Sequence, residues 1–158
     1  MSVKNLLSKL FFSWYWYCAY RVISDEEIKN GSPVFETGEV REYKVINVPK
    51  GYWIADPFVM TKNGVTVAFF ELTDQKKHKS MLGAKQILPT EGEVKIIYEF
   101  EGHTSYPCLF EDNGNIYMIP ETGANRTVEL FCCKEWPYKW EKKCDLLKDI
   151  FYRGLYSF

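Results

Sequence analysis

The stretch ADPFVMTKNGVTVAFFEL, residues 55–72, returns in register as SYPCLFEDNGNIYMIPET, residues 105–122. When the two copies are aligned without a gap, they share a proline, an Asn-Gly pair and a glutamate. The matching pairs are Pro57 with Pro107, Asn63 with Asn113, Gly64 with Gly114 and Glu71 with Glu121, all at an offset of 50 residues. Four matches at one offset, inside the same apolar pattern, indicate a repeated structural unit.

Each copy has the pattern of a β-hairpin. An apolar run ends at Asn-Gly, and a second apolar run follows at once. Asn-Gly favours the two-residue turn of a hairpin because both residues tolerate positive φ. The runs are rich in β-branched and aromatic residues, which are typical of half-buried strands.

A second pair of strands is predicted after each hairpin. The pairs are 84–88 with 94–100, turning at 90–93, and 127–133 with 139–147, turning at 135–138. The sequence therefore predicts four strands per 50 residues, twice. Four-stranded units at a fixed period favour the blades of a β-propeller over a sandwich, whose strands need not recur in groups of four.

The residues before the repeat predict a different arrangement. We expect a short helix at 3–10, a strand at 14–23, a turn or short helix opening at 24–27, and extended chain at 33–35 and 43–48. Lys9 interrupts the first apolar run and no small-residue cleavage site follows, which argues against a signal peptide. The run is also too short and too polar to span a bilayer. In a propeller, an N-terminal strand of this kind would complete the last blade.

The composition of the chain limits the kinds of ligand that it is expected to bind. The net charge of −1 gives no electrostatic reason to bind nucleic acid or an anionic membrane. The five cysteines are an odd number without zinc-ligand spacing, which favours reduced thiols in the cytoplasm and predicts no metal or cofactor. The charge run KKHK at 76–79 is interpreted as a solvated loop, with a phosphate-binding patch as the alternative.

Polar residues at matching places in the two copies are the candidates for chemistry. Asp56 opens the first strand of the first unit, and Glu71 and Glu121 end the second strand of each unit. Carboxylates that converge on a channel are what glycosidic bond cleavage needs, because one acid protonates the leaving oxygen while one base activates water or attacks. The alternative is structural: carboxylates at strand ends also bind backbone N–H groups and hold units together.

Further polar and aromatic residues surround these carboxylates. His103 and Tyr106 lie just before and at the start of the second unit, near the place that Asp56 holds in the first. Trp53, Tyr52 and Tyr106 are aromatic residues that could stack on the face of a sugar. We therefore expect Trp53, Glu71, His103, Tyr106 and Glu121 to contact a glycan.

Five motifs carry a resemblance to a known family: YWIADPF (52–58), FFE (69–71), HTSYP (103–107), YMIPE (117–121) and WPYKW (136–140). Over about residues 14–147 the chain resembles the N-terminal domain of glucosamine inositolphosphorylceramide transferases. That domain is similar in fold to the five-bladed β-propellers of family-43 glycoside hydrolases. The resemblance implies an all-β, partial five-bladed propeller, and it places the general base of those hydrolases at Asp56.

The resemblance also implies what the chain lacks. The second aspartate and the glutamic acid of the hydrolases come from later blades and have no counterpart here, and Glu121 matches the family's own Pro-Glu motif instead. We expect one incomplete propeller domain over 1–158, with closing strands in 14–50, blades in 51–102 and 103–149, and a tail in 150–158. Two blades do not close a ring, so we expect a truncated piece of a longer protein, or a short form completed by a partner.

Three functions are compatible with these observations. We expect a non-catalytic, glycan-binding module associated with a glycosyltransferase, whose partners are a glycan and a downstream chain or domain that completes the propeller. The first alternative is a family-43-like hydrolase or sugar-transfer enzyme, with Asp56 as its general base. The second is a purely structural fragment whose carboxylates stabilise strand ends.

Overall fold

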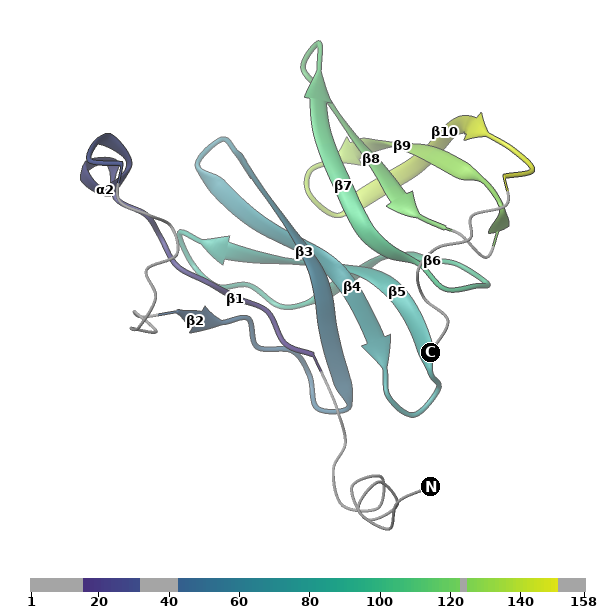
Figure 1. Cartoon of the computed structure of the whole chain (residues 1–158), viewed down its shortest axis with the longest axis horizontal. Helices are drawn as coiled ribbons and strands as arrows, with labels where there is room; N and C mark the ends of the chain where they lie inside the picture. The colour runs from purple at the N-terminus through teal and green to yellow at the C-terminus, as the bar shows by residue number, and fades with distance from the viewer. Residues whose placement is uncertain (1–15, 32–42, 123–124, 151–158) are drawn as a thin grey trace.

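Two four-stranded antiparallel sheets dominate the computed structural model, which describes residues 16–31, 43–122 and 125–150 (Figure 1). Sheet 1 consists of β3 (Tyr52–Lys62), β4 (Val65–Asp74), β5 (Lys79–Leu88) and β6 (Lys95–Glu99). Sheet 2 consists of β7 (Ser105–Asp112), β8 (Asn115–Glu121), β9 (Val128–Glu135) and β10 (Lys139–Leu147). In both sheets, neighbouring strands are neighbours in the chain. The predicted all-β class and the four-stranded repeat are confirmed.

Both predicted hairpin turns are confirmed by the backbone. Asn63 and Gly64 have φ values of 52° and 76°, and Asn113 and Gly114 have φ values of 49° and 77°. Positive φ at both central residues is what this turn requires and what Asn-Gly tolerates. The same local chemistry therefore produces the same turn twice.

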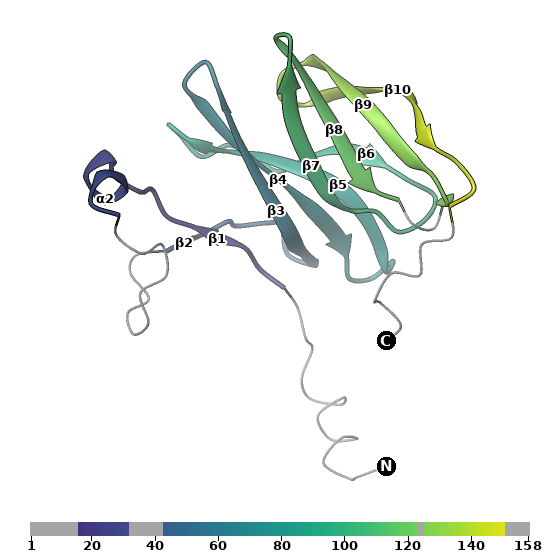
Figure 2. The ribbon, with the colours of Figure 1, turned by 45° about the horizontal axis from the view of Figure 1, so that its top comes forward.

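The main core lies between the two sheets. Along β4, alternate side chains such as Val67 and Phe69 point toward sheet 2, because successive residues of a strand face opposite sides. Met118 and Phe131 face them from sheet 2. The Phe69 ring centroid lies 5.7 Å from that of Trp136 and 5.9 Å from that of Trp140, so sheet 2 surrounds it with aromatic rings. Strand β7 lies beside β3 in both views (Figure 2).

The second face of sheet 1 is covered by two N-terminal segments, residues 16–20 and 43–48, which we call the strap. The strap contains β1 (Ala19–Tyr20) and β2 (Lys44–Val45), which pair antiparallel. Its buried side chains Cys18 and Ile46 join a second apolar cluster with Phe70 and Leu72 of β4. The strap thus gives sheet 1 an apolar cover on the side opposite sheet 2.

Several predicted boundaries need correction. The expected strand at 14–23 is wrong in length: within the described residues only Ala19–Tyr20 is a strand, since its neighbour β2 is equally short. The first strand of the repeat begins at Tyr52, and β5 begins at Lys79 because Lys79 pairs with Asp74. Residues 75–78 form the exposed turn that the charge run predicted.

The turn or short helix expected from Ser24 is present as α2 (Asp25–Lys29). Ser24 and Glu27 form a capping box, in which each side chain bonds the backbone N–H of the other residue. The expected helix at 3–10, the extended chain at 33–35 and residues 151–158 of the expected tail lie outside the described residues.

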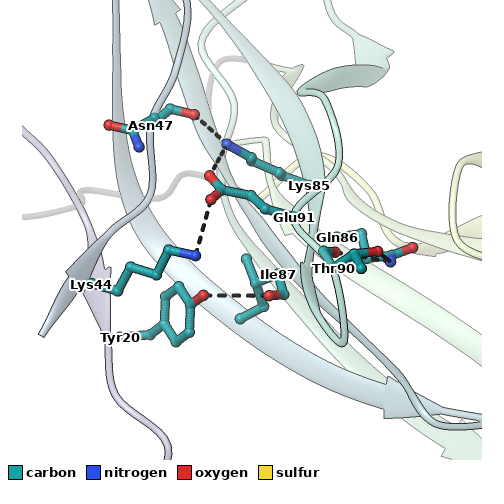
Figure 3. Close-up of polar contacts among 8 residues, drawn as sticks. All are labelled: Tyr20, Lys44, Asn47, Lys85, Gln86, Ile87, Thr90 and Glu91. Carbon is teal, nitrogen blue, oxygen red and sulfur yellow. Dashed lines mark hydrogen bonds and ion pairs between the residues drawn. The ribbon is translucent and has the colours of Figure 1, made fainter.

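A polar clasp holds the strap to sheet 1 (Figure 3). The Nζ of Lys85, which is buried, donates to the Asn47 carbonyl at 2.8 Å and also pairs with Glu91. The second oxygen of Glu91 lies 3.1 Å from Lys44 Nζ in the strap. Hydrogen bonds from the two lysines lower the pKa of Glu91. Tyr20 adds a hydrogen bond from its hydroxyl to the Ile87 carbonyl, at 3.3 Å.

We expect Phe69→Ala to destabilise the fold by about 3–5 kcal/mol, because it leaves a cavity in the middle of the inter-sheet core. The measurement is urea unfolding followed by tryptophan fluorescence, which also reports on Trp136 and Trp140. Phe110→Ala is the matched control, because Phe110 is 38% exposed. Equal losses for the two variants would contradict the assignment of Phe69 to the centre of the core.

We expect Glu91→Gln to loosen the strap and cost about 1–3 kcal/mol, because the buried Lys85 ammonium loses its charged partner. The pKa of Glu91 is lowered in the folded state, so its contribution is present above its ordinary value of 4.5 and is lost as the pH falls below it. The variant should therefore lose less stability than the wild type between about pH 6 and about pH 3.

The measurement for this clasp is urea unfolding at both pH values, together with hydrogen exchange of the Ile46 amide, which donates to the Cys18 carbonyl in the strap. Glu99→Gln is the matched control, since the pair of Glu99 with Lys79 is exposed and worth less than about 1 kcal/mol. Unchanged exchange at Ile46 in Glu91→Gln would show that the clasp does not hold the strap.

Candidate functional site

The two sheets repeat one strained feature. The pairing register shifts between Ala55 and Phe58 in β3 and between Ser105 and Cys108 in β7, so each strand has a bulge just before or at its proline. Asp56 and Tyr106 lie in these bulges with φ values of 49° and 45°. A left-handed backbone costs a residue with a side chain about 1–2 kcal/mol. The same strain therefore occurs at the same place in both repeats.

The bulges change what the strands expose. Tyr106 is 57% exposed although it lies within a strand of the sheet, and Asp56 is exposed as well. Bulges commonly redirect side chains and are frequent next to binding sites. Since β3 and β7 are spatial neighbours, the structure has two equivalent exposed side chains on adjacent strands. We call Trp53, Asp56, Glu71, His103, Tyr106 and Glu121 the bulge site.

The two glutamates of the bulge site flank the bulges. Glu71 in β4 pairs with Ala55, next to Asp56, and Glu121 in β8 pairs with Ser105, next to Tyr106. The two glutamates, which lie 50 residues apart in the sequence, thus occupy equivalent positions in the two sheets. The Ser105 hydroxyl donates to Glu121 Oε2 at 3.2 Å, and Glu121 is half-buried.

Glu71 is buried, with a side chain only 5% exposed. Its Oε1 accepts hydrogen bonds from the hydroxyls of Thr73 at 2.9 Å and Ser80 at 2.7 Å. The same oxygen lies 4.0 Å from His103 Nδ1, and the imidazole is 63% exposed. Buried carboxylates need partners of this kind. The Glu71 carboxylate therefore lies near the imidazole of His103, and His103 is the member of the pair that reaches the surface.

Asp56 lies on the strap side of the site. Burial, and to a smaller extent the negative charge of Asp56, together raise the pKa of the Cys18 thiol to about 11. Cys18 in turn points its thiol at the Ile54 carbonyl, 3.6 Å away. Cys18 of the strap is thus close enough to feel the charge of Asp56, while Trp53 is half-buried and pairs with Thr73 before the bulge begins.

The structure brings two of the predicted residues close together and leaves others apart. His103 and Glu71 lie 4.0 Å apart. Among the described residues, no side-chain hydrogen bond or ion pair joins Asp56, Trp53 or Tyr106 to the other members of the site. Thr73 and Ser80 were missed from the sequence. Their signal was available, since a hairpin turning at residues 75–78 places them opposite each other and next to Glu71.

The described ranges contain neither a metal-ion cluster nor a membrane-spanning helix. Over residues 16–31, 43–122 and 125–150, no three His, Cys, Asp or Glu side chains gather closely enough to hold a metal ion. In the same ranges, no helix has the length and apolar character needed to cross a bilayer.

Comparison with known proteins identifies the family. Residues 30–153 match the model of the family described as glucosamine inositolphosphorylceramide transferase 1, N-terminal. The chain belongs to this family. It is 27% identical over 99 residues to glucosamine inositolphosphorylceramide transferase 1 of Arabidopsis thaliana, covering 61% of this chain and 13% of that protein.

Proteins of the same name from two rice subspecies, Oryza sativa subsp. indica and subsp. japonica, are each 26% identical over 95 residues. The match covers 56% of this chain and 12% of each rice protein. The chain thus spans about an eighth of the length of these curated relatives. No solved structure matches. The resemblance seen in the five sequence motifs is confirmed at the level of the family.

We expect Asp56→Gly and Tyr106→Gly to leave the stability of the fold unchanged or raise it by up to about 1 kcal/mol, because glycine adopts positive φ without strain. Thermal unfolding measures this effect. Asp56→Val is the opposing control, since a β-branched residue at this φ should destabilise by about 1–3 kcal/mol. A marked loss of stability in both glycine variants would show that these side chains serve the fold.

Proposed function

We propose that this chain is a glycan-binding module that holds a sugar at the bulge site for a glycosyltransferase, without cleaving the sugar itself. The observation that carries the proposal is the repeated strain at Asp56 and Tyr106. Strained residues cluster at binding sites, where the rest of the structure maintains them. Membership of a family named after glucosamine inositolphosphorylceramide transferases supports a sugar as the ligand.

The chemistry of the bulge site suits a sugar. An exposed tyrosine ring such as that of Tyr106 offers a flat apolar surface to the C–H groups of a pyranose, while its hydroxyl remains free to hydrogen bond. The Asp56 carboxylate accepts hydrogen bonds from sugar hydroxyls, and His103 donates or accepts one from its ring nitrogens. An ammonium group on the sugar, as in glucosamine, would add a charge-assisted bond to Asp56.

The role of Glu71 argues against hydrolysis. Glycoside hydrolases need two carboxyl groups that flank the same bond, about 5–9.5 Å apart. Glu71 is buried and engaged by Thr73 and Ser80, so it is oriented to support His103 rather than to reach a substrate. Glu71 is therefore a poor candidate for the acid partner of Asp56.

We further propose that the two sheets are consecutive blades of a β-propeller. Four-stranded antiparallel units that follow chain order, with their first strands side by side, support this arrangement. The central axis would then run beside β3 and β7, with the bulge site at one of its ends. Free thiols throughout the described part of the chain suit a reducing compartment, and we propose the cytoplasm.

The binding proposal is tested by saturation-transfer NMR with glucosamine, glucose and myo-inositol. We expect glucosamine to bind best, and we expect Tyr106→Ala and Asp56→Asn each to weaken its binding about tenfold or more. Tyr138→Ala is the matched control, since Tyr138 packs against the core between the sheets, away from the bulge site. Equal binding by wild type, Tyr106→Ala and Asp56→Asn would refute the site.

The absence of turnover is tested with 4-nitrophenyl glycosides. We expect no release of nitrophenol above the rate of buffer alone, in wild type and in Asp56→Asn. Hydrolysis by the wild type that is lost in Asp56→Asn would instead establish the hydrolase, with Asp56 as the general base, and would overturn the non-catalytic assignment.

A further inference from the structure

The core between the two sheets is formed by faces that are not equivalent in the two repeats. Sheet 1 contributes Val67 and Phe69 of β4, whose counterparts in sheet 2, 50 residues on, are Tyr117 and Ile119 of β8. Sheet 2 instead contributes Met118, the residue between them. Because side chains alternate along a strand, Tyr117 and Ile119 face away from sheet 1. The face of sheet 1 that meets sheet 2 thus corresponds to the face of sheet 2 that points away from it.

This second face of sheet 2, which we call the open face, is largely apolar. Its apolar residues come from three neighbouring strands: Cys108, Phe110, Tyr117, Ile119, Leu130 and Cys132. Strand β10 adds a charged border, since Glu141 pairs with Cys132 and Lys143 Nζ lies 4.8 Å from the ring centroid of Tyr117. Cys108 pairs with Ile119, and Cys132 pairs with Tyr117, so the side chains form continuous rows across the sheet. The rings of Phe110 and Tyr117 stack with centroids 5.5 Å apart.

The two equivalent faces differ in burial. Val67 and Phe69 are fully buried by sheet 2, whereas Phe110 is 38% exposed and Cys108, Ile119, Leu130 and Cys132 are half-buried; Tyr117 is the exception and is buried. Over the described ranges, no strand or helix packs on the open face. Contiguous apolar surface of this kind marks an interaction site.

We propose that the open face is a docking surface for a third four-stranded sheet of the same repeat type. The interface between sheets 1 and 2 indicates which partner the open face would take. In that interface, Val67 and Phe69 of sheet 1 pack against a face of sheet 2 that bears Met118, Phe131 and Trp140. The open face carries apolar residues at the positions equivalent to Val67 and Phe69. The complementary partner is therefore a sheet whose face carries residues like Met118, Phe131 and Trp140. This inference rests on the blade arrangement proposed above and is independent of the glycan site.

The structure also argues against a second copy of this chain as the occupant. The face of sheet 1 that corresponds to the Met118 face of sheet 2 carries Ala68, Phe70 and Leu72, and the strap already covers it through Cys18 and Ile46. A second copy would therefore have to release its strap, with its buried Lys85 clasp, before it could bind head to tail.

The thiols of the chain provide the test. Cys108 and Cys132 lie on the open face, whereas Cys18 and Cys133 contact the two cores and have pKa values raised by burial to about 11. The probe is the full chain with a second copy of residues 100–149 appended after Phe158, in which the cysteines of the appended copy are alanine. In the control, the appended copy also carries Met118→Lys and Phe131→Lys.

We expect maleimide labelling of Cys108 and Cys132, read by mass spectrometry, to be at least about tenfold slower with the intact appended sheet than with the control. Equal rates would overturn the proposal. Concentration-dependent protection of the chain without any appended sheet, accompanied by a dimer in ultracentrifugation, would also overturn it in favour of a second copy. Glucosamine binding, measured on the same samples, separates failure of the docking surface from failure of the glycan site.

Discussion

The contact of Phe69 with sheet 2 is the interaction on which the rest of the structure depends. Its ring is fully buried and meets both Trp136 and Trp140, which come from the last hairpin of the second repeat. An isolated sheet with one apolar face is not stable in water, because that face must be buried against another layer. The two repeats satisfy this need for each other, and in doing so they bring β3 and β7, and with them the two bulges, side by side.

The bulge site shows how such packing supports strain. Asp56 and Tyr106 occupy a backbone conformation that their side chains disfavour, and each precedes a proline that removes one ladder donor. The surrounding pairing holds them there, since β4 and β8 bond on both sides of each bulge. The buried Glu71 carboxylate accepts hydrogen bonds from Thr73 and Ser80 and lies 4.0 Å from the imidazole of His103. Asp56 and Tyr106 are thus presented by strands of the sheets, whereas His103 lies in the connection between β6 and β7.

Much of the fold follows from local sequence, and the remainder depends on tertiary pairing. Asn-Gly fixes both hairpins without help from the rest of the chain, which is why they were predicted correctly. The start of β5 at Lys79 was missed because charged residues there pair with Asp74 in a sheet whose apolar pattern begins later. Similarly, the bulges and the burial of Glu71 depend on strands that meet only in the folded state, so the sequence indicated the candidate residues but not their exposure.

The two outer faces of the pair of sheets differ: the strap covers the outer face of sheet 1, whereas the outer face of sheet 2 is the open face. At one end the strap buries the face that carries Phe70 with only a few apolar side chains, and it needs the clasp of Lys85 and Glu91 to remain in place. At the other end the open face has the chemistry that binds an entire sheet elsewhere in the same chain. Repeated units add neighbours through such matched faces, since each unit buries the face that the previous one exposes. Within the described residues, the strap therefore covers the outer face of sheet 1, whereas no strand or helix covers the open face of sheet 2.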